Sequence, residues 1–233
     1  MTPRLCVLYE DNHLLAVSKP AMLATMGVAA GEPSLWSLCR EYLRQKYHKP
    51  GNVYLGVVSR LDSPVTGIVL FARTSKAAAR LSRVYRERRV AKVYWALVSG
   101  RIAPASGQCV DWVLKDDRAA RMRVVQEGQP GAQQARLSYR TLRSAGDCQL
   151  LEVVLQTGRK HQIRLQLAAR GHPVLGDQKY GSRRRFPAGI ALHARLLELV
   201  HPVRRTALRL VAPLPASWRR EGWDEGPGGL EDP

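Results

Sequence analysis

Short apolar runs bounded by turn-forming residues recur along the chain, and they predict a fold rich in strands. Runs of about four to eight apolar, β-branched or aromatic residues between Gly, Pro, Asn or Asp are typical of strands. We expect strands near residues 5–9, 14–17, 53–58, 68–73, 92–98, 109–114, 121–126, 134–143, 150–156, 190–199 and 206–211. The first two flank a polar turn, so they are expected to form a hairpin.

Three other segments repeat their apolar residues with the period of a helix. We expect helices at about 34–47 and 74–88, because each begins with Ser or Thr and then carries one apolar face. A third helix begins near His161 and is ended by Gly171. No internal repeat and no Gly- or Ser-rich linker divides the chain. We therefore expect one domain over 1–220, followed by an acidic, Gly/Pro-rich disordered tail over 221–233.

The charge balance changes this picture from a generic domain to one with an anionic partner. The chain of 233 residues has 37 Lys and Arg against 19 Asp and Glu, a net charge of +18. Because the tail holds five of the acids and none of the bases, residues 1–220 carry +23. Such an excess indicates a polyanion, of which nucleic acid is the commonest. An anionic membrane is the rival, although no basic amphipathic helix with an aromatic face stands out. A merely soluble basic surface is the third reading.

Cysteine usage and the N-terminus bear on compartment. The four cysteines are scattered, with no Cys-x-x-Cys and no clustered histidines, which argues against a zinc site or a disulfide framework. The first residues lack the apolar core of a secretory signal, and no apolar run approaches the ~20 residues that span a bilayer. We expect a cytoplasmic protein.

A candidate reactive carboxylate lies just before the apolar run 68–73. Asp62 follows Arg60 by two residues and precedes a turn punctuated by Pro64 and Gly67. A carboxylate on a loop at a strand edge, near a cation, is expected to be ionised and so suits a nucleophile or an anchoring anion. The plainer reading is a turn residue or a solvated ion pair with Arg60.

Two clusters of cations accompany it. The outer face and C-terminal turn of the helix 74–88 carry five arginines, and the helix dipole explains only one or two of them. Arg159, Lys160, His161 and Arg164 crowd the start of the third helix, where the dipole disfavours cations but anions bind. Arg164 could also reach inward to a buried carboxylate. A solvated basic turn is the alternative for this second cluster.

Together these motifs resemble those of the RluA-type pseudouridine synthases. The resemblance runs in order through about residues 5–215. The matching stretches are Tyr9-Glu10-Asp11, Lys19-Pro20, Arg60-Leu61-Asp62, Thr66-Gly67, Lys92-x-Tyr94, Thr157-Gly158-Arg159-x-His161-Gln162-Ile163-Arg164, Gly171-His172-Pro173-x-Leu175-Gly176-Asp177, Tyr180-Gly181, Leu192-His193-Ala194 and His201-Pro202. Ser59 stands where the family usually has His, and Asp62-Ser63-Pro64-Val65-Thr66-Gly67 replaces its usual Asp-x-x-Thr-Ser-Gly. These departures put substrate choice or turn packing in doubt, but not the retained aspartate.

The resemblance implies an α+β fold: a central mixed, largely antiparallel sheet with flanking helices and an RNA-binding cleft. It implies an isomerase that converts uridine to pseudouridine in rRNA or tRNA without a cofactor or metal. By resemblance, Asp62 is the nucleophile, Tyr94 stacks on the base and relays a proton, and Arg164 pairs with Asp62. Arg60 fills the place of a flipped-out nucleotide or holds phosphate. The residues expected to bind RNA are Arg60, Arg83, Arg86, Arg88, Arg89, Lys92, Arg159, Lys160 and His161.

Other readings stay open. Without its motif, Tyr94 reads as a packing tyrosine of a strand. The chain could be an RNA-binding or RNA-chaperone protein on the same fold, although a binding protein has no need of a carboxylate in a basic cleft. A DNA-binding protein lacks support, since no helix-turn-helix or finger pattern is present. We expect a monomer with no obligate protein partner. Because the resemblance starts close to Met1, we expect no S4-like RNA-binding module.

Overall fold

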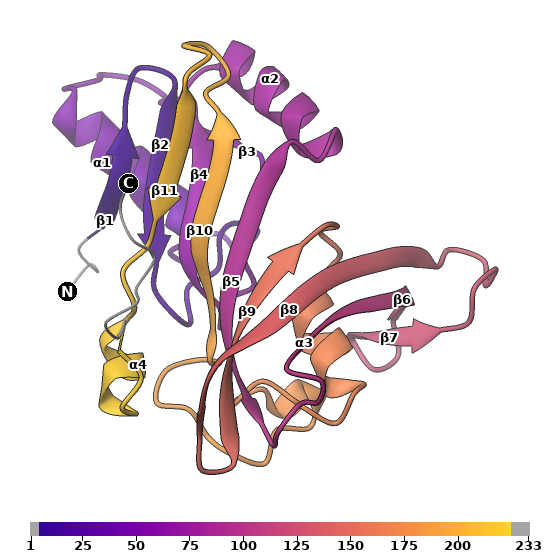
Figure 1. The fold of residues 1–233 in the computed structure, drawn as a ribbon. Helices are drawn as coiled ribbons and strands as arrows, with labels where there is room; N and C mark the ends of the chain where they lie inside the picture. Colours follow the sequence, from indigo (N-terminus) through magenta and orange to yellow (C-terminus); the bar gives the residue numbers. More distant parts are fainter. Residues whose placement is uncertain (1–4, 225–233) are drawn as a thin grey trace.

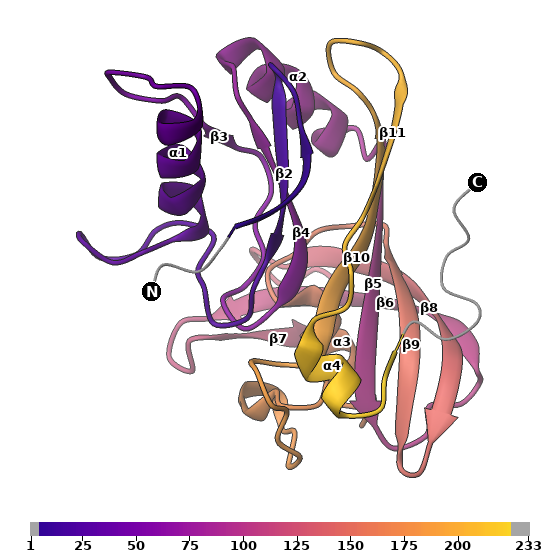
Figure 2. The same ribbon diagram turned by 90° about the vertical axis from the view of Figure 1, so that its left-hand side faces the viewer.

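The computed structural model describes residues 5–224, which form one twisted sheet with helices packed on it (Figure 1 and Figure 2). The strands are β1 (Cys6–Glu10), β2 (Leu14–Lys19), β3 (Gly56–Val57), β4 (Thr66–Ala72), β5 (Val90–Ser99), β6 (Ser106–Asp116), β7 (Arg121–Val125), β8 (Gln133–Ala145), β9 (Cys148–Leu155), β10 (Leu192–Val200) and β11 (Ala207–Val211). The helices are α1 (Leu35–Lys46), α2 (Ser75–Arg86), α3 (Gln162–Ala168) and α4 (Ala216–Arg220), with a 3₁₀ turn, η1, at Gln178–Tyr180.

The order of the strands places late segments of the chain in the middle of the sheet. Along the sheet the order is β1-β2-β4-β10-β5-β9-β8-β6-β7, with β3 beside β4 and β11 beside β10. Every pair is antiparallel except β4 with β10. The predicted class, an α+β fold on a mixed and largely antiparallel sheet, is confirmed.

The predicted strand at 53–58 is wrong over most of its length. Only β3 pairs with a neighbour, while Val53 and Leu55 are buried against α1 without joining the ladder. Side chains of α1 take their carbonyl groups instead: Arg40 Nε donates to Val53 O at 2.9 Å, and Trp36 Nε1 donates to Leu55 O at 2.8 Å. The apolar alternation is that of a strand, but helix side chains replace the strand partner.

The two long helices begin where their capping residues predict. Ser34 accepts a hydrogen bond from the backbone N–H of Ser37, whose own side chain accepts from the N–H of Ser34, a capping box. Thr74 accepts from the N–H of Ala77 in the same way. Each cap satisfies a helix N–H that would otherwise lack a partner, a contribution of about 1 kcal/mol.

Strands β2 and β4 are apolar on both faces because a helix covers each face. In β2, Leu15 and Val17 belong to the apolar cluster under α1, whereas Leu14 and Ala16 belong to the cluster under α2. Side chains alternate across a strand, so successive residues of β2 pack against opposite helices. The two helices lie on either side of these strands in Figure 2.

The other half of the sheet forms a third core around β5, β8, β9 and α3, to which the end of the described chain also packs. Trp218 of α4 is fully buried there, and Trp223 is buried with it. Residues 221–224, the start of the predicted tail, are thus part of the folded domain. Residues 225–233 lie outside the described part. Within residues 5–224 no helix is long and apolar enough to cross a membrane.

The two halves of the sheet meet at a short parallel junction. Strands β4 and β10 pair only through Thr66 with His193 and Gly67 with Ala194, after which β11 takes over the edge of β10. The Oγ1 atom of Thr66 lies 2.8 Å from Nδ1 of His193. Gly67 has φ +109°, and a Cβ placed there would lie 2.3 Å from the carbonyl oxygen of Ala194. Only glycine permits this approach, which fixes where the loop before β4 sits.

Candidate active site

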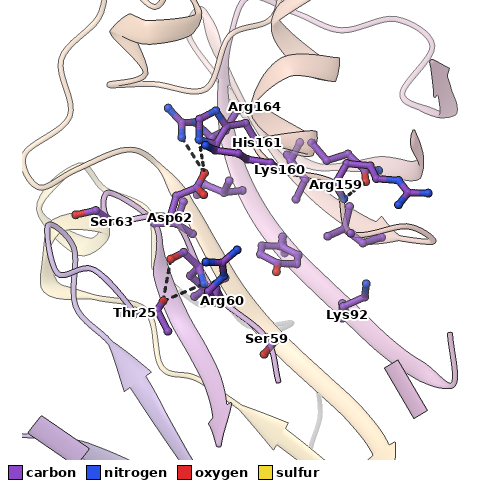
Figure 3. A pocket seen from close by; sticks show the side chains of 18 of the residues that line it. Thr25, Ser59, Arg60, Asp62, Ser63, Lys92, Arg159, Lys160, His161 and Arg164 are labelled. Carbon is purple, nitrogen blue, oxygen red and sulfur yellow. Dashed lines mark hydrogen bonds and ion pairs between the residues drawn. The ribbon is translucent and has the colours of Figure 1, made fainter. Parts of the chain in front are cut away.

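A cavity of about 780 Å³ opens beside this junction and is lined by both halves of the sheet. One wall is the loop 57–65 before β4, together with residues 24–26. The other is made of β5, the end of β9 and the turn into α3. Figure 3 shows Asp62 facing Arg164 and His161 across the cavity, with Lys92 and Arg159 further along the second wall.

Asp62 shares its arginine with a second carboxylate. Arg164 Nη1 donates to Asp62 Oδ2 at 2.8 Å. The same guanidinium binds Asp177 through two bonds, Nε to Oδ2 at 2.6 Å and Nη2 to Oδ1 at 2.9 Å. The Asp177 side chain is 1% exposed and that of Asp62 is 28% exposed. Asp177 therefore fixes the planar fork of Arg164, and the third nitrogen, Nη1, holds Asp62.

Only one oxygen of Asp62 is held. Both ring and guanidinium contacts reach Oδ2: Arg164 at 2.8 Å and His161 Nε2 at 3.6 Å. Within residues 5–224 we find no hydrogen bond to Oδ1, and Asp62 lines the cavity. A carboxylate fixed through one oxygen and open at the other can act as a nucleophile, a base or a ligand.

A buried lysine supports the loop from below. Lys19 is 1% exposed, and its Nζ donates to the carbonyl oxygens of Pro20, Leu23 and Ser63 at 2.9, 2.7 and 2.8 Å. Burial lowers the pKa of Lys19 to about 7, while the charge of Asp62 opposes this shift. An ammonium ion has three N–H groups, and each donates to one of these carbonyl oxygens. The protonated side chain therefore ties the loop after β2 to the loop that carries Asp62.

A second tie joins the same two loops. The hydroxyl of Thr25 donates to Leu61 O at 2.9 Å and accepts from Leu61 N at 3.1 Å. This reciprocal pair fixes the backbone of the residue that precedes Asp62. Asp62 is therefore presented by a rigid loop.

Two tyrosines and a lysine also line the cavity. Burial, with smaller effects from Tyr85 and Asp62, raises the pKa of Tyr94, so it is a neutral phenol at neutral pH. Burial also raises the pKa of Tyr85, whose hydroxyl lies 3.4 Å from Ser59 Oγ. The pKa of Lys92 is lowered by burial and by Arg88. This part of the cavity lining thus combines two aromatic rings with a lysine.

Most of the residues that the sequence singles out come together here. The eight that line the cavity are Arg60, Asp62, Lys92, Tyr94, Arg159, Lys160, His161 and Arg164. Arg88 and Lys92 line an adjoining hollow of about 270 Å³. Arg83, Arg86 and Arg89 line neither and are exposed on or after α2, with Arg89 paired to Glu87.

The cations at the start of α3 are used differently from one another. Arg164 turns inward to Asp177, the second of the readings that the sequence leaves open. Arg159 Nε donates to the carbonyl oxygen of Gln134 at 2.9 Å. His161 is drawn to Tyr180, 2.8 Å from its hydroxyl. Lys160 is the exposed member of the cluster.

Sequence reasoning missed three residues of this site as candidates: Lys19, Asp177 and Tyr180. All three lie in stretches that carry the family resemblance, which is the one signal that could have pointed to them. Their partners lie far along the chain, as with Lys19 and Ser63, 44 residues apart. Spacing and periodicity contain no information on such pairs.

Comparison with known proteins adds three findings. The family model for RNA pseudouridylate synthase matches residues 13–169. A ribosomal large subunit pseudouridine synthase D of Xylella fastidiosa is 34% identical over 223 residues, 90% of this chain and 66% of that protein. An uncharacterized RNA pseudouridine synthase of Bacillus subtilis is 32% identical over 216 residues, 91% of this chain and 70% of that protein.

The solved structure of human RNA pseudouridylate synthase domain containing 4 superimposes on this chain with a TM-score of 0.76. The two share 26% identity, and the match covers 92% of each chain. The chain also matches an uncharacterized RNA pseudouridine synthase of Chloroflexus aurantiacus at 42% identity over 169 residues. It spans about half the length of that relative and about two thirds of the Xylella protein.

Proposed function

The chain belongs to the RNA pseudouridylate synthase family, of RluA type, and we propose that it converts uridine to pseudouridine in RNA with Asp62 as the nucleophile. In this isomerisation the bond between N1 of uracil and C1′ of ribose breaks, the base turns, and C5 bonds to C1′. The proton lost from C5 balances the proton gained by N1. The reaction therefore consumes no oxidant, reductant or second substrate.

Asp62 is proposed to attack the nucleotide through Oδ1, at C1′ of the ribose or C6 of the base. Arg164 holds Oδ2, and Asp177 holds Arg164. The carboxylate of Asp62 therefore keeps its orientation while Oδ1 forms the new bond. The half-open carboxylate in a cavity between the two halves of the sheet is the observation that carries this proposal.

Tyr94 is proposed to stack on the freed base and to relay the C5 proton. Because burial raises its pKa, Tyr94 meets the substrate as a phenol. A phenol can take the C5 proton only as it passes its own proton on, so Tyr94 acts as a relay and not as a standing base. A stacked ring also retains the uracil between bond breaking and bond formation.

RNA affinity is proposed to come from the cations around the cavity. Arg60, Lys92 and Lys160 line it directly, and Arg88 extends the cationic surface into the adjoining hollow. A net charge of +18 supplies further sequence-independent attraction to phosphates. Arg83, Arg86 and Arg89 lie outside the cavity and are proposed to contact RNA beyond the target nucleotide.

Release of tritium tests the function directly. The purified protein is incubated with RNA transcribed from 5-tritiated uridine, and tritium released to water is counted. We expect release by the wild type and background release by Asp62→Asn, with equal RNA affinity in filter binding. RNA binding without release by the wild type would instead identify a non-catalytic RNA-binding protein. Release by Asp62→Asn at the wild-type rate would exclude Asp62 as the nucleophile.

Ribosomal RNA is the proposed substrate, with the protein working as a cytoplasmic monomer. Relatives that match over most of this chain carry the name ribosomal large subunit pseudouridine synthase. Mapping pseudouridines in total RNA from cells with and without the gene tests this choice. We expect sites to vanish from large-subunit RNA; loss from transfer RNA alone would contradict it. Light scattering of the purified protein reports the mass of the particle.

A further inference from the structure

His161 enters the cavity on a strained backbone. It precedes α3 with φ 54° and ψ 22°, the left-handed region, and makes no side-chain capping bond. Such a conformation costs a non-glycine residue roughly 1–3 kcal/mol and persists where a function or its surroundings require it. Among the non-glycine residues with positive φ in the described chain, His161 is the one that lines the cavity.

The surroundings of the ring select one neutral tautomer. The hydroxyl oxygen of Tyr180 accepts a hydrogen bond from the backbone N–H of Met122 at 3.0 Å and lies 2.8 Å from His161 Nδ1. The other ring nitrogen, Nε2, lies 3.6 Å from Asp62 Oδ2. A lone pair on Nε2 would face the lone pairs of the carboxylate, so the proton belongs on Nε2. Nδ1 is then the acceptor, and Tyr180 donates to it.

Burial favours the neutral form of the ring, and the charges around it act in both directions. Burial lowers the pKa of His161; Asp62 opposes this, and Arg164, Lys160 and Lys179 reinforce it. These four, with the Tyr180 hydroxyl, are the titratable or charged groups that face the ring from the loop, α3 and η1. Arg164 already supplies a full positive charge to Asp62 Oδ2. His161 adds a neutral donor to the same oxygen.

We propose that His161 is a positioning residue for the nucleophile, a role that rests on the proposed function. Its Nε2–H group and Arg164 together hold Oδ2 of Asp62. The Tyr180 hydroxyl sets the tautomer in which Nε2 carries the proton. Two donors on one oxygen fix the rotation of the carboxylate, which leaves Oδ1 facing the nucleotide. The 3.6 Å separation shortens to a hydrogen bond when RNA fills the cavity, as catalytic contacts commonly do.

The tautomer can be read by ¹⁵N NMR of histidine in the purified protein. The signal of His161 is the histidine signal that is absent from His161→Gln, and at pH 7 we expect it to show a protonated Nε2 and an unprotonated Nδ1. An imidazolium or a proton on Nδ1 at this residue would overturn the proposal. The measurement needs no activity, so it stands even where a variant is inactive.

Kinetics test the chain of contacts. We expect His161→Gln to lower the single-turnover rate at saturating RNA about tenfold to a hundredfold with unchanged RNA affinity, because a misplaced reactant costs up to about a hundredfold. Tyr180→Phe, which keeps the ring over Arg164, should lower the rate several-fold in the wild type but not further in His161→Gln. His172→Gln, outside the cavity, is the matched control.

The possible outcomes of these experiments separate a positioning role of His161 from its alternatives. Equal effects of Tyr180→Phe in both backgrounds would mean that the hydroxyl acts through another contact, such as its bond from Met122 N–H, and not through His161, against the proposal. A loss of RNA affinity with a normal rate in His161→Gln would make His161 an RNA contact, also against it. Urea unfolding of each variant confirms that it is folded at the assay temperature. If Asp62→Asn remains active, the proposed function fails; if it is inactive and the His161 variants are normal, only this inference fails.

Discussion

Two aspartates stand at opposite ends of the same pair of strands, and they differ in how the fold uses them. Strands β2 and β4 are antiparallel, with Leu14 opposite Ala72 and Lys19 opposite Gly67. Asp11 belongs to the turn that leads into β2, and Asp62 to the turn that leads into β4. One therefore lies at each end of the ladder.

Both carboxylate oxygens of Asp11 accept hydrogen bonds. Its Oδ1 accepts the backbone N–H groups of His13 and Leu14, both at 2.8 Å. Its Oδ2 accepts from the Tyr9 hydroxyl at 3.1 Å and lies 3.1 Å from His201 Nε2 and 3.2 Å from Arg204 Nε. Among the described residues, the Asp62 carboxylate is contacted by Arg164 and the His161 ring alone, and both lie at one oxygen.

The contrast separates a carboxylate that serves the structure from the one proposed to react in this fold. Asp11 is 5% exposed and serves the turn, the hairpin and the loop after β10 at once. Asp62 is 28% exposed, and its carboxylate makes few contacts with its own loop. Lys19 and Thr25 hold that loop instead, so the fold does not depend on the Asp62 side chain.

Replacing Asp62 should separate activity from stability most strongly. We expect Asp62→Asn to lower the single-turnover rate by at least about a thousandfold, as loss of a nucleophile does. The free energy of unfolding should change by less than about 1 kcal/mol, because Arg164 keeps both bonds to Asp177. Rates come from tritium release and stability from urea titration. A large loss of stability would place Asp62 with Asp11 as a structural residue.

Replacing Arg164 should damage both properties. Arg164→Met leaves Asp177, 1% exposed, as a buried charge without its partner, which costs about 3–5 kcal/mol. The rate should also fall, since Oδ2 of Asp62 then loses its hydrogen bond from Arg164 and keeps only the longer contact with His161. The double variant Arg164→Met/Asp177→Asn is the control, because it removes the buried charge: we expect stability to recover in part and activity to stay low. Recovery of activity would show that Arg164 serves only folding.

Replacing Asp11 should have the converse effect to Asp62. Asp11→Asn keeps the shape but loses the carboxylate that accepts both backbone N–H groups and faces His201. We expect the free energy of unfolding to fall by about 1–3 kcal/mol, with the single-turnover rate unchanged at a temperature where the variant is folded. A loss of rate in the folded variant would mean that the two ends of the β2–β4 ladder are coupled.

The pH dependence of stability gives the smallest and sharpest signal. Burial opposes ionisation of Asp11, but the N–H groups of His13 and Leu14 hold its pKa below the usual value. As pH falls, the unfolded chain binds this proton first, so the stabilisation is present above the unfolded pKa of about 3.9 and is lost through the lower, folded value. Asp11→Asn should therefore show a shallower loss of unfolding free energy below about pH 4.5. An unchanged slope would contradict this account.

The sequence predicts the elements well where burial follows from local pattern. The caps at Ser34 and Thr74 and the strand at 14–17 depend on residues a few positions apart, and all three are as expected. The segment 53–58 fails because its carbonyl groups are taken by Trp36 and Arg40, residues that a strand pattern does not consider.

The site shows the same division. Family motifs point to Asp62 and Arg164, and their pairing across 102 residues is found as expected. The supports of that pair are invisible to the pattern. Lys19 reads as the end of a strand and Tyr180 as part of a turn, because burial and distant partners, not neighbours, define what they do. The catalytic roles themselves stay predictions.

The place of β10 in the sheet has a consequence for synthesis of the protein. Strand β10 lies between β4 and β5, yet it comes about a hundred residues after them along the chain. While the ribosome is making the protein, β4 and β5 each wait with an open edge, which is a site for mispairing. Asp62 meets Arg164 on a finished scaffold only once residues 192–200 have emerged. A truncated translation product would thus carry Asp62 but lack the scaffold that places it beside Arg164.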